Sequence, residues 1–163
     1  MKRPWFKLGP VDESFFEDAP FVMRKSFDTA VPAADVWAEL TGVHPLAWCR
    51  IIGPKGINWT SEPPYGVGST RTVSSLKGAS VFREHFFVWE EGKRKSFYVV
   101  EASGPLFKRF AEDYVVEPLT DTTSRFTWTI AAEPKLPGAL ANPLNKRLLG
   151  TLFADTRKHY ASA

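Results

Sequence analysis

The sequence predicts an α+β protein in which an antiparallel sheet carries its helices on one face. Three observations lead to this fold class. Six strand-like segments joined by turns fill the middle of the chain. One strand and a short helical stretch precede them, and the longest amphipathic helix pattern comes last. Strands in succession, with helices only before and after them, are typical of an antiparallel sheet with its helices segregated on one face.

Length and composition restrict the classes of protein to which the chain can belong. The chain has 163 residues, of which 24% are charged and 44% hydrophobic, as in a single soluble globular domain. No stretch approaches the roughly 20 consecutive apolar residues of a membrane span, so no integral membrane segment is expected. An acidic stretch at 12–18 lies where a secretion signal would be apolar, which favours a cytoplasmic protein. Cys49 is the only cysteine, which excludes intrachain disulfides and Cys-rich zinc sites.

Charge and motif spacing exclude further classes. The 21 basic and 18 acidic residues are interspersed, whereas nucleic-acid binding proteins usually cluster Lys and Arg on one face. The three histidines, His44, His85 and His159, are not spaced as metal ligands. The 66–71 segment, Gly-Val-Gly-Ser-Thr-Arg, lacks the third glycine of a dinucleotide-binding loop. We therefore expect no nucleic-acid partner, no metal and no cofactor.

Residues 1–20 are predicted to form an N-terminal arm, and residues 21–163 a single domain. Prolines interrupt the arm, its charges change sign midway, and no hydrophobic period is sustained. Its aromatic residues suggest that it lies on the body of the protein or covers a neighbouring subunit, as in a homodimer. These aromatic residues are Trp5, Phe6, Phe15 and Phe16.

The domain begins with a strand at 21–29, in which apolar and polar residues alternate. A helix is predicted at 31–40, with Pro32 in its first turn and Asp35 near the positive end of its dipole. Residues 44–49 form at most one further short helix.

Six strands and a long helix are predicted to follow. The pairs 77–78 and 91–92 each end in glycine and have the form of two-residue hairpin turns. Asn142 followed by Pro143 is a favourable helix start, and apolar residues then recur every three or four positions. The predicted strands are 51–60, which is broken, 67–75, 79–90, 93–102, 107–118 and 122–133.

With these residues, the element order resembles the START/Bet v 1-like superfamily, in particular its polyketide cyclase/dehydrase-like branch. The resemblance spans residues 21–160 and implies a helix-grip fold: a curved seven-stranded antiparallel sheet around the C-terminal helix, with two short helices after the first strand and an enclosed cavity. Members bind lipids, sterols, polyketides or hormones, and a minority act as cyclases or aromatases. The motifs that carry the resemblance are Pro32-Ala-Ala-Asp-Val-Trp37, His44-Pro45 with Trp48, Gly66-Val-Gly-Ser-Thr-Arg71, the 122–128 strand and the closing helix.

The resemblance also implies that the segment with His44 and Trp48 borders the cavity mouth. Strand alternation predicts which side chains face the cavity from the sheet. If both glycine pairs are two-residue turns, the cross-strand pairs are Arg71 with Glu84, Glu84 with Val99 and Phe82 with Glu101. The apolar residues expected on this inward face are Val67, Val73, Phe82, Phe86, Val88, Phe97 and Val99.

Three charged residues on that face, Arg71, Glu84 and Glu101, require an explanation, because buried charges are costly unless they are paired. One explanation is a polar spot that anchors a carbonyl, hydroxyl or carboxylate group of a ligand. Another is an internal salt bridge without a functional role. The third is a register displaced by one residue, which would leave all three side chains in water.

The last hairpin leaves its register open, since the loop near 120–123 holds two or three residues. One choice places Asp113 beside Trp128 on the inward face, and the other places Glu112 and Tyr114 there. The residues expected to form wall or core from this hairpin and the last helix are Phe126, Trp128, Ile130, Leu148, Leu152 and Phe153.

Two function classes follow. The first is a carrier or sensor that binds a hydrophobic small molecule, such as a lipid, sterol or polyketide, in the cavity. The second is a cyclase or aromatase-like enzyme in which polar cavity residues act by general acid–base catalysis. The sequence favours the first class, because no residue in it is recognisable as a base with a pKa near neutrality. Whether the protein is an enzyme, and which residues would be catalytic, is left open.

Overall fold

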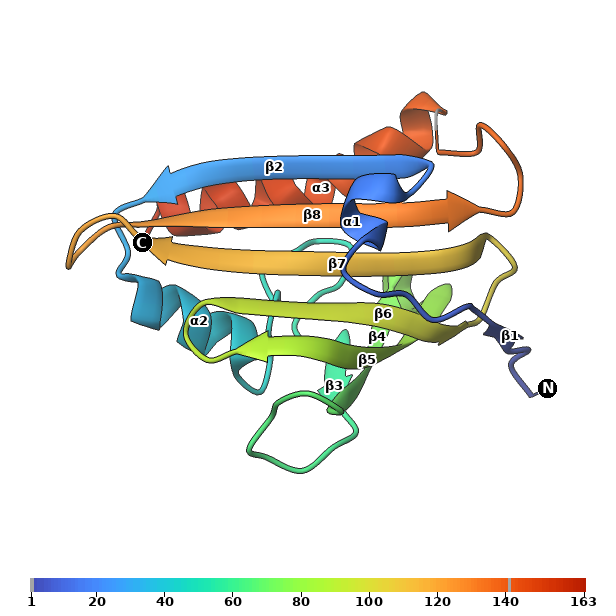
Figure 1. Ribbon diagram of the computed structural model, residues 1–163, viewed down its shortest axis with the longest axis horizontal. Helices are drawn as coiled ribbons and strands as arrows, with labels where there is room; N and C mark the ends of the chain where they lie inside the picture. Colours follow the sequence, from blue (N-terminus) through green and yellow to red (C-terminus); the bar gives the residue numbers. More distant parts are fainter. Residues whose placement is uncertain (1, 141) are drawn as a thin grey trace.

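The computed structural model describes residues 2–140 and 142–163. Its strands form one curved antiparallel sheet in the order β2-β8-β7-β6-β5-β4-β3, with the short β1 paired to β6 (Figure 1). The strands are β1 (Phe6–Lys7), β2 (Phe21–Thr29), β3 (Ile57–Trp59), β4 (Thr70–Ser75), β5 (Ser80–Glu90), β6 (Arg94–Ala102), β7 (Phe107–Pro118) and β8 (Ser124–Pro134). The predicted fold class, a helix-grip arrangement of a curved sheet and a long C-terminal helix, is confirmed.

Helix α3 (Pro143–Ala161) lies along the sheet behind β2 and β8 (Figure 1). It starts as predicted, because Asn142 Oδ1 accepts a hydrogen bond from the Leu144 amide at 2.9 Å. Its apolar side packs on the sheet, and near its end the Thr29 hydroxyl donates to the Tyr160 carbonyl oxygen at 3.0 Å. The structure therefore buries the amphipathic stripe against the sheet. Among the described residues, no helix is long and apolar enough to cross a membrane.

Only one helix, α2 (Ala33–Thr41), lies in the described stretch between β2 and β3, so the prediction of a second short helix there is wrong. Helix α2 is followed by turns. Pro45 disfavours helical conformation at the residue before it, and Leu46 has a left-handed φ of 57°. Two strands are also shorter than predicted. The segment 51–60 is extended only in β3, and β4 starts at Thr70 rather than at 67.

The N-terminal arm lies on the body, as expected, but it contains a strand and a helix that the sequence analysis did not predict. Helix α1 (Phe15–Asp18) covers the convex face of β7 and β8, opposite to α3 (Figure 1). Phe15 and Phe16 are buried there against Ala111 and Ala131. The arm is thus docked on its own chain, while a homodimer formed through it stays a prediction.

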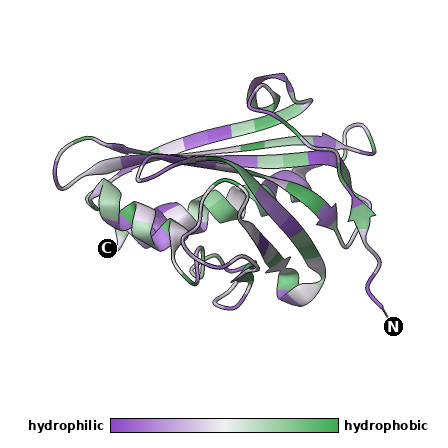
Figure 2. Cartoon of the chain, turned by 60° about the horizontal axis from the view of Figure 1, so that its bottom comes forward, coloured by the Kyte–Doolittle hydropathy of each residue, from purple (hydrophilic) through white to green (hydrophobic). Residues whose placement is uncertain are grey.

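Along the strands, hydrophilic and hydrophobic residues succeed one another, as Figure 2 shows. The hydrophobic residues of the concave face form the main core with α2 and α3. A second, smaller cluster lies on the convex face under α1. Because both faces of the sheet are covered in part, small displacements of strand register decide which polar side chains become buried.

Candidate functional site

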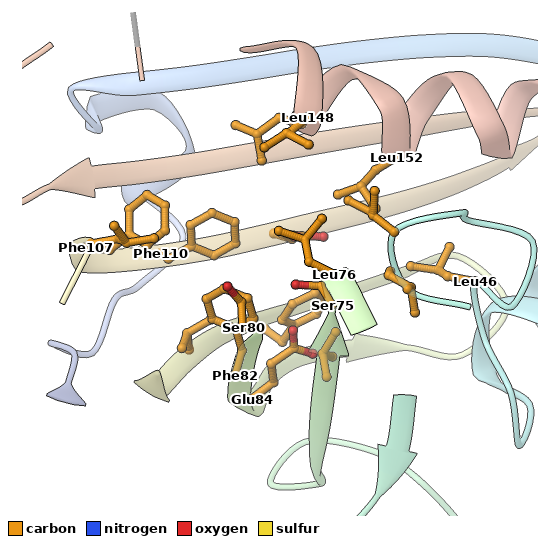
Figure 3. Close-up of a pocket in the computed structure, with 18 of the residues that line it drawn as sticks. Leu46, Ser75, Leu76, Ser80, Phe82, Glu84, Phe107, Phe110, Leu148 and Leu152 are labelled. Atoms are coloured by element: carbon orange, nitrogen blue, oxygen red, sulfur yellow. The ribbon is translucent and has the colours of Figure 1, made fainter. Parts of the chain in front are cut away.

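A cavity of about 230 Å³ lies between the concave face of the sheet and α3. Leu148 and Leu152 reach it from α3, while Phe107 and Phe110 of β7 and Phe82 of β5 face it from the sheet (Figure 3). The wall is mostly apolar, and its polar groups come from a few side chains. Those polar lining residues are Arg71, Ser75, Ser80, Glu84, Glu112, Tyr114, Trp128 and Asn145.

Arg71 and Glu84 form a buried ion pair at the inner wall. They are direct cross-strand neighbours, as predicted, and Arg71 Nε donates to Glu84 Oε2 at 2.5 Å. The connection between β4 and β5 is longer than a two-residue turn, because Ser75 pairs with Ser80. The loop is widened by one residue on each side, so the predicted register is retained. Nη1 of Arg71 is buried and has no hydrogen-bond partner among the described residues.

Between β5 and β6, two errors in the predicted register cancel. Glu90 pairs with Arg94, so the turn holds three residues rather than two. A β-bulge between Phe86 and Val88 then shifts the register back. Glu84 therefore faces Val99, as predicted.

A second bulge, between Arg83 and Glu84, removes Glu101 from the cavity. Beyond it, Phe82 faces Ala102, and Glu101 lies opposite Arg83 on the convex side. Arg83 Nη1 contacts Glu101 Oε2 at 2.5 Å in a partly exposed ion pair. The predicted pairing of Phe82 with Glu101, and the place of Glu101 in the cavity, are wrong because an extra residue turns the side chain to the other face.

Val67 and Val88 are also wrongly predicted to face inward. Val88 follows the first bulge and pairs with Ser96, whose side chain bonds to Asp113 on the convex face. Val67 precedes β4 and is exposed.

Most of the other predicted cavity residues do line it. Phe86 is fully buried but packs behind the wall, where it contacts Trp59, Trp89 and Phe97. The predicted residues that the structure places along the cavity are Arg71, Glu84, Phe82, Phe97, Val99, Trp128, Leu148 and Leu152.

The two residues expected at the cavity mouth lie elsewhere. Trp48 stacks on His159 with ring centroids 4.0 Å apart and donates its indole N–H to Thr156 Oγ1 at 3.0 Å, near the end of α3. His44 is exposed in the turn after α2. Neither side chain lines the cavity, but the segment that holds them does border it, since Leu46 between them and Ile51 and Ile52 just after them are lining residues.

The last hairpin takes the register that places Glu112 and Tyr114 inward. Tyr114 lies opposite Trp128. Glu112 Oε2 accepts hydrogen bonds from the Tyr114 hydroxyl and from Trp128 Nε1, both at 2.9 Å. Asp113 lies on the convex face, where Arg94 Nε and the Ser96 hydroxyl donate to it. The alternative left open by the sequence is thereby decided.

Lys95 is a buried charged residue that the sequence analysis missed. Its ammonium group donates to the Leu40 carbonyl oxygen near the end of α2 and lies among the rings of Phe86, Trp89 and Tyr114. Its alternation with Phe97 and Val99 along β6 is the signal that could have identified it as inward-facing. It does not line the cavity.

Burial controls the protonation of this cluster. It raises the pKa of Glu112 to about 7, with the Glu84 carboxylate adding to the effect. Burial also raises the pKa of Glu84, although the Arg71 guanidinium opposes this shift. Burial and the charge of Arg71 hold the pKa of Lys95 well below its ordinary value. The carboxyl groups of Glu84 and Glu112 therefore give the cavity wall groups that can donate, accept or exchange a proton. The described residues contain no cluster of His, Cys, Asp and Glu suited to a metal ion.

A curved sheet wrapped on a C-terminal helix around a cavity defines the START/Bet v 1-like fold, and solved structures share it. A START superfamily protein from Mycobacterium smegmatis matches with a TM-score of 0.66 and 18% identity over 84% of this chain and 92% of that one. Ginseng major latex-like protein 151 from Panax ginseng matches with a TM-score of 0.63 and 19% identity over 86% and 97%. The resemblance found in the sequence is confirmed at the level of fold.

The sequence itself matches mycobacterial proteins more closely. Uncharacterized protein Rv2574 of Mycobacterium tuberculosis and uncharacterized protein Mb2604 of Mycobacterium bovis are each 34% identical to this chain over 160 residues, which cover 92% of this chain and 93% of theirs. The chain belongs to the family of these proteins. No protein-family profile matches it.

Proposed function

We propose that this protein is a carrier or sensor that binds a compact, largely apolar small molecule in the cavity. The observation that carries the proposal is an apolar cavity closed at its inner wall by buried polar groups, Arg71, Glu84 and Glu112. Ligand sites commonly combine apolar walls with a few placed polar groups that fix orientation. A volume of about 230 Å³ lies below the roughly 300–1,000 Å³ of sites for drug-sized ligands, which favours a single ring system or a short chain.

The polar cluster indicates which ligand group would bind there. Arg71 has a buried Nη1 without a hydrogen-bond partner among the described residues, and a buried donor without an acceptor is unfavourable. A carbonyl, hydroxyl or carboxylate oxygen would supply the acceptor. The rest of the ligand would contact Val99, Phe110 and Leu152.

The test compares the wild type with a variant whose cavity is filled. Leu148→Trp places a larger side chain in the cavity, and Leu144→Trp, on the exposed side of the same helix, is the matched control. The wild type and both variants are screened by thermal shift against single-ring aromatic acids, phenols and short-chain fatty acids, since a bound ligand stabilises the folded state. We expect stabilisation of the wild type and of Leu144→Trp but not of Leu148→Trp. Equal responses of all three proteins would contradict a ligand site in the cavity.

One observation favours the enzymatic alternative, a cyclase-like reaction. Glu112 has a pKa of about 7, lines the cavity and accepts a hydrogen bond from Tyr114. A group with a pKa near the working pH is suited to general acid–base catalysis. An enzyme would convert the bound compound, and Glu112→Gln would abolish conversion but retain binding. A carrier would release the compound unchanged, which mass spectrometry of the recovered ligand would show.

A further inference from the structure

One end of the sheet opens next to the cavity. The turns that join β4 to β5 and β6 to β7, and the linker from β8 to α3, all lie at this end, beside the start of α3. The linker is tied to the neighbouring turn, since the Lys135 amide donates to the Leu106 carbonyl oxygen at 2.9 Å. Leu76 and Leu106 from the two turns line the cavity and are also partly exposed. We call this region the open end.

Four exposed leucines gather at the open end. Single exposed apolar residues are ordinary, but a group of them beside a cavity marks an interaction surface. Two of them come from the turns and two from the linker and the first turn of α3. Their exposed fractions are 44% for Leu76, 57% for Leu106, 73% for Leu136 and 63% for Leu144.

The same segments are basic. Residues 76–80, 103–108 and 133–147 contain five basic side chains and a single acidic one, Glu133. Glu133 is already paired with Arg109 at 2.7 Å and Lys108 at 3.4 Å. The basic side chains are Lys77, Lys108, Lys135, Lys146 and Arg147.

The opposite end of the sheet carries exposed charges of both signs, including the basic residues Lys93, Arg125, Arg157 and Lys158. The turns after β5 and β7 carry exposed acidic residues, and so does α2. These are Glu90, Glu91, Glu117, Asp121, Asp35 and Glu39. Only at the open end do basic side chains clearly outnumber acidic ones in the segments around the cavity, and the four exposed leucines lie among them.

We propose that the open end docks on an anionic phospholipid surface. Leucine side chains at this end would enter the interface, and the lysines and arginine around them would lie at the level of the headgroups. Each basic side chain at an anionic surface strengthens binding about fivefold. The combination of apolar and basic groups complements a negatively charged bilayer. A small anion in solution would contact only the basic groups and leave the leucines exposed to water.

Docking would place the cavity against the bilayer, so that an apolar ligand could pass between them with little exposure to water. This consequence rests on the proposed ligand binding. The docking itself does not, because the leucines and basic residues lie on the surface and act whether or not the cavity is filled.

The experiment measures co-sedimentation of the full chain with vesicles. One set contains phosphatidylcholine alone, and the other contains equimolar phosphatidylcholine and phosphatidylglycerol. Lys146→Glu/Arg147→Glu tests charge at the open end, and Arg157→Glu/Lys158→Glu, at the other end of α3, is its matched control. Leu106→Ser/Leu136→Ser tests the apolar contact. Its matched control is Val43→Ser/Leu119→Ser, at positions of 70% and 46% exposure in other turns.

We expect binding to the anionic vesicles only, weakened about 25-fold or more by the charge reversal at the open end and about tenfold by the leucine substitutions. Both controls should change binding by less than about threefold, because their side chains lie at the far end of the protein, beyond the Debye length over which the surface charge of the bilayer acts. Absence of binding to anionic vesicles, or equal losses in test and control variants, would overturn the proposal. Since this assay contains no cavity ligand, its failure would leave the thermal-shift result for the cavity unaffected, and the two proposals fail separately.

Discussion

Arg71 and Glu84 face each other across β4 and β5, with Nε 2.5 Å from Oε2 and both side chains almost wholly removed from solvent. The guanidinium also lies 4.5 Å from the centre of the Phe97 ring and 5.0 Å from that of Phe86. In such surroundings each charge is stabilised by the opposite charge, which the strand pairing holds in place, because neither group can reach water. This pair forms the inner wall of the cavity, and the polar part of the ligand would bind beside it.

The first prediction concerns this compensation. Arg71→Met should lower the free energy of unfolding by about 3–5 kcal/mol, because it leaves the Glu84 carboxylate buried without its partner. The double variant Arg71→Met/Glu84→Gln should recover much of the loss, since neither charge remains. Urea unfolding of the wild type, both single variants and the double variant measures the coupling. Additive effects of the two substitutions would contradict a compensated pair.

The second prediction concerns pH. The pKa of Glu112 is about 7 in the folded protein, above its ordinary value of 4.5, because burial disfavours the carboxylate. The folded state therefore holds more protons than the unfolded state between these values. The stabilising contribution is complete below pH 4.5 and is lost as the pH rises through 7. The loss amounts to roughly 3 kcal/mol.

Chemical unfolding across this interval measures the slope. Glu112→Gln should remove the decline, because the amide has no proton to lose in this range and can still accept from Tyr114 and Trp128. Asp121→Asn, in an exposed turn, is the control and should retain the wild-type slope. An unchanged slope in Glu112→Gln would show that another group titrates.

The third prediction concerns the wall contributed by α3. Leu152→Ala should lower the free energy of unfolding by about 2–5 kcal/mol, since Leu152 is buried against the sheet and lines the cavity. Leu144→Ala, on the exposed side of the same helix, should change it by less than about 0.5 kcal/mol. Thermal and urea unfolding of both variants provide the comparison. A loss at Leu152 as small as at Leu144 would mean that α3 is not held by its apolar side.

The fourth prediction concerns the arm. A chain that starts at residue 21 should fold, because all seven strands of the main sheet order, with α2 and α3, lie beyond that point. It should lose about 3–6 kcal/mol of stability, the value of burying two phenylalanine side chains, Phe15 and Phe16. Phe15→Ala/Phe16→Ala in the full chain should be similarly destabilised, since the same contacts are lost. Circular dichroism and urea unfolding test this, and an unfolded truncated chain would refute it.

The sequence by itself determined the fold class and most of the strands. Alternation, glycine turns and the Asn142-Pro143 helix start are local signals, and they led to β2 and β7 with the bounds that the structure has. The ion pair of Arg71 and Glu84 could be predicted as well, because widening the turn symmetrically does not change the pairing of the strands that it joins. The resemblance of motifs and element order supplied the closed, cavity-forming arrangement.

The tertiary structure alone decided which polar groups reach the cavity. The bulge between Arg83 and Glu84 turns Glu101 to the convex face, and a bulge depends on packing against neighbouring strands rather than on the local residues. Glu112 faces inward because β7 pairs with β8 in one of two registers that the loop sequence allowed equally. The pKa of Glu112 and the burial of Lys95 then follow from desolvation by residues distant in the chain, which no local pattern contains.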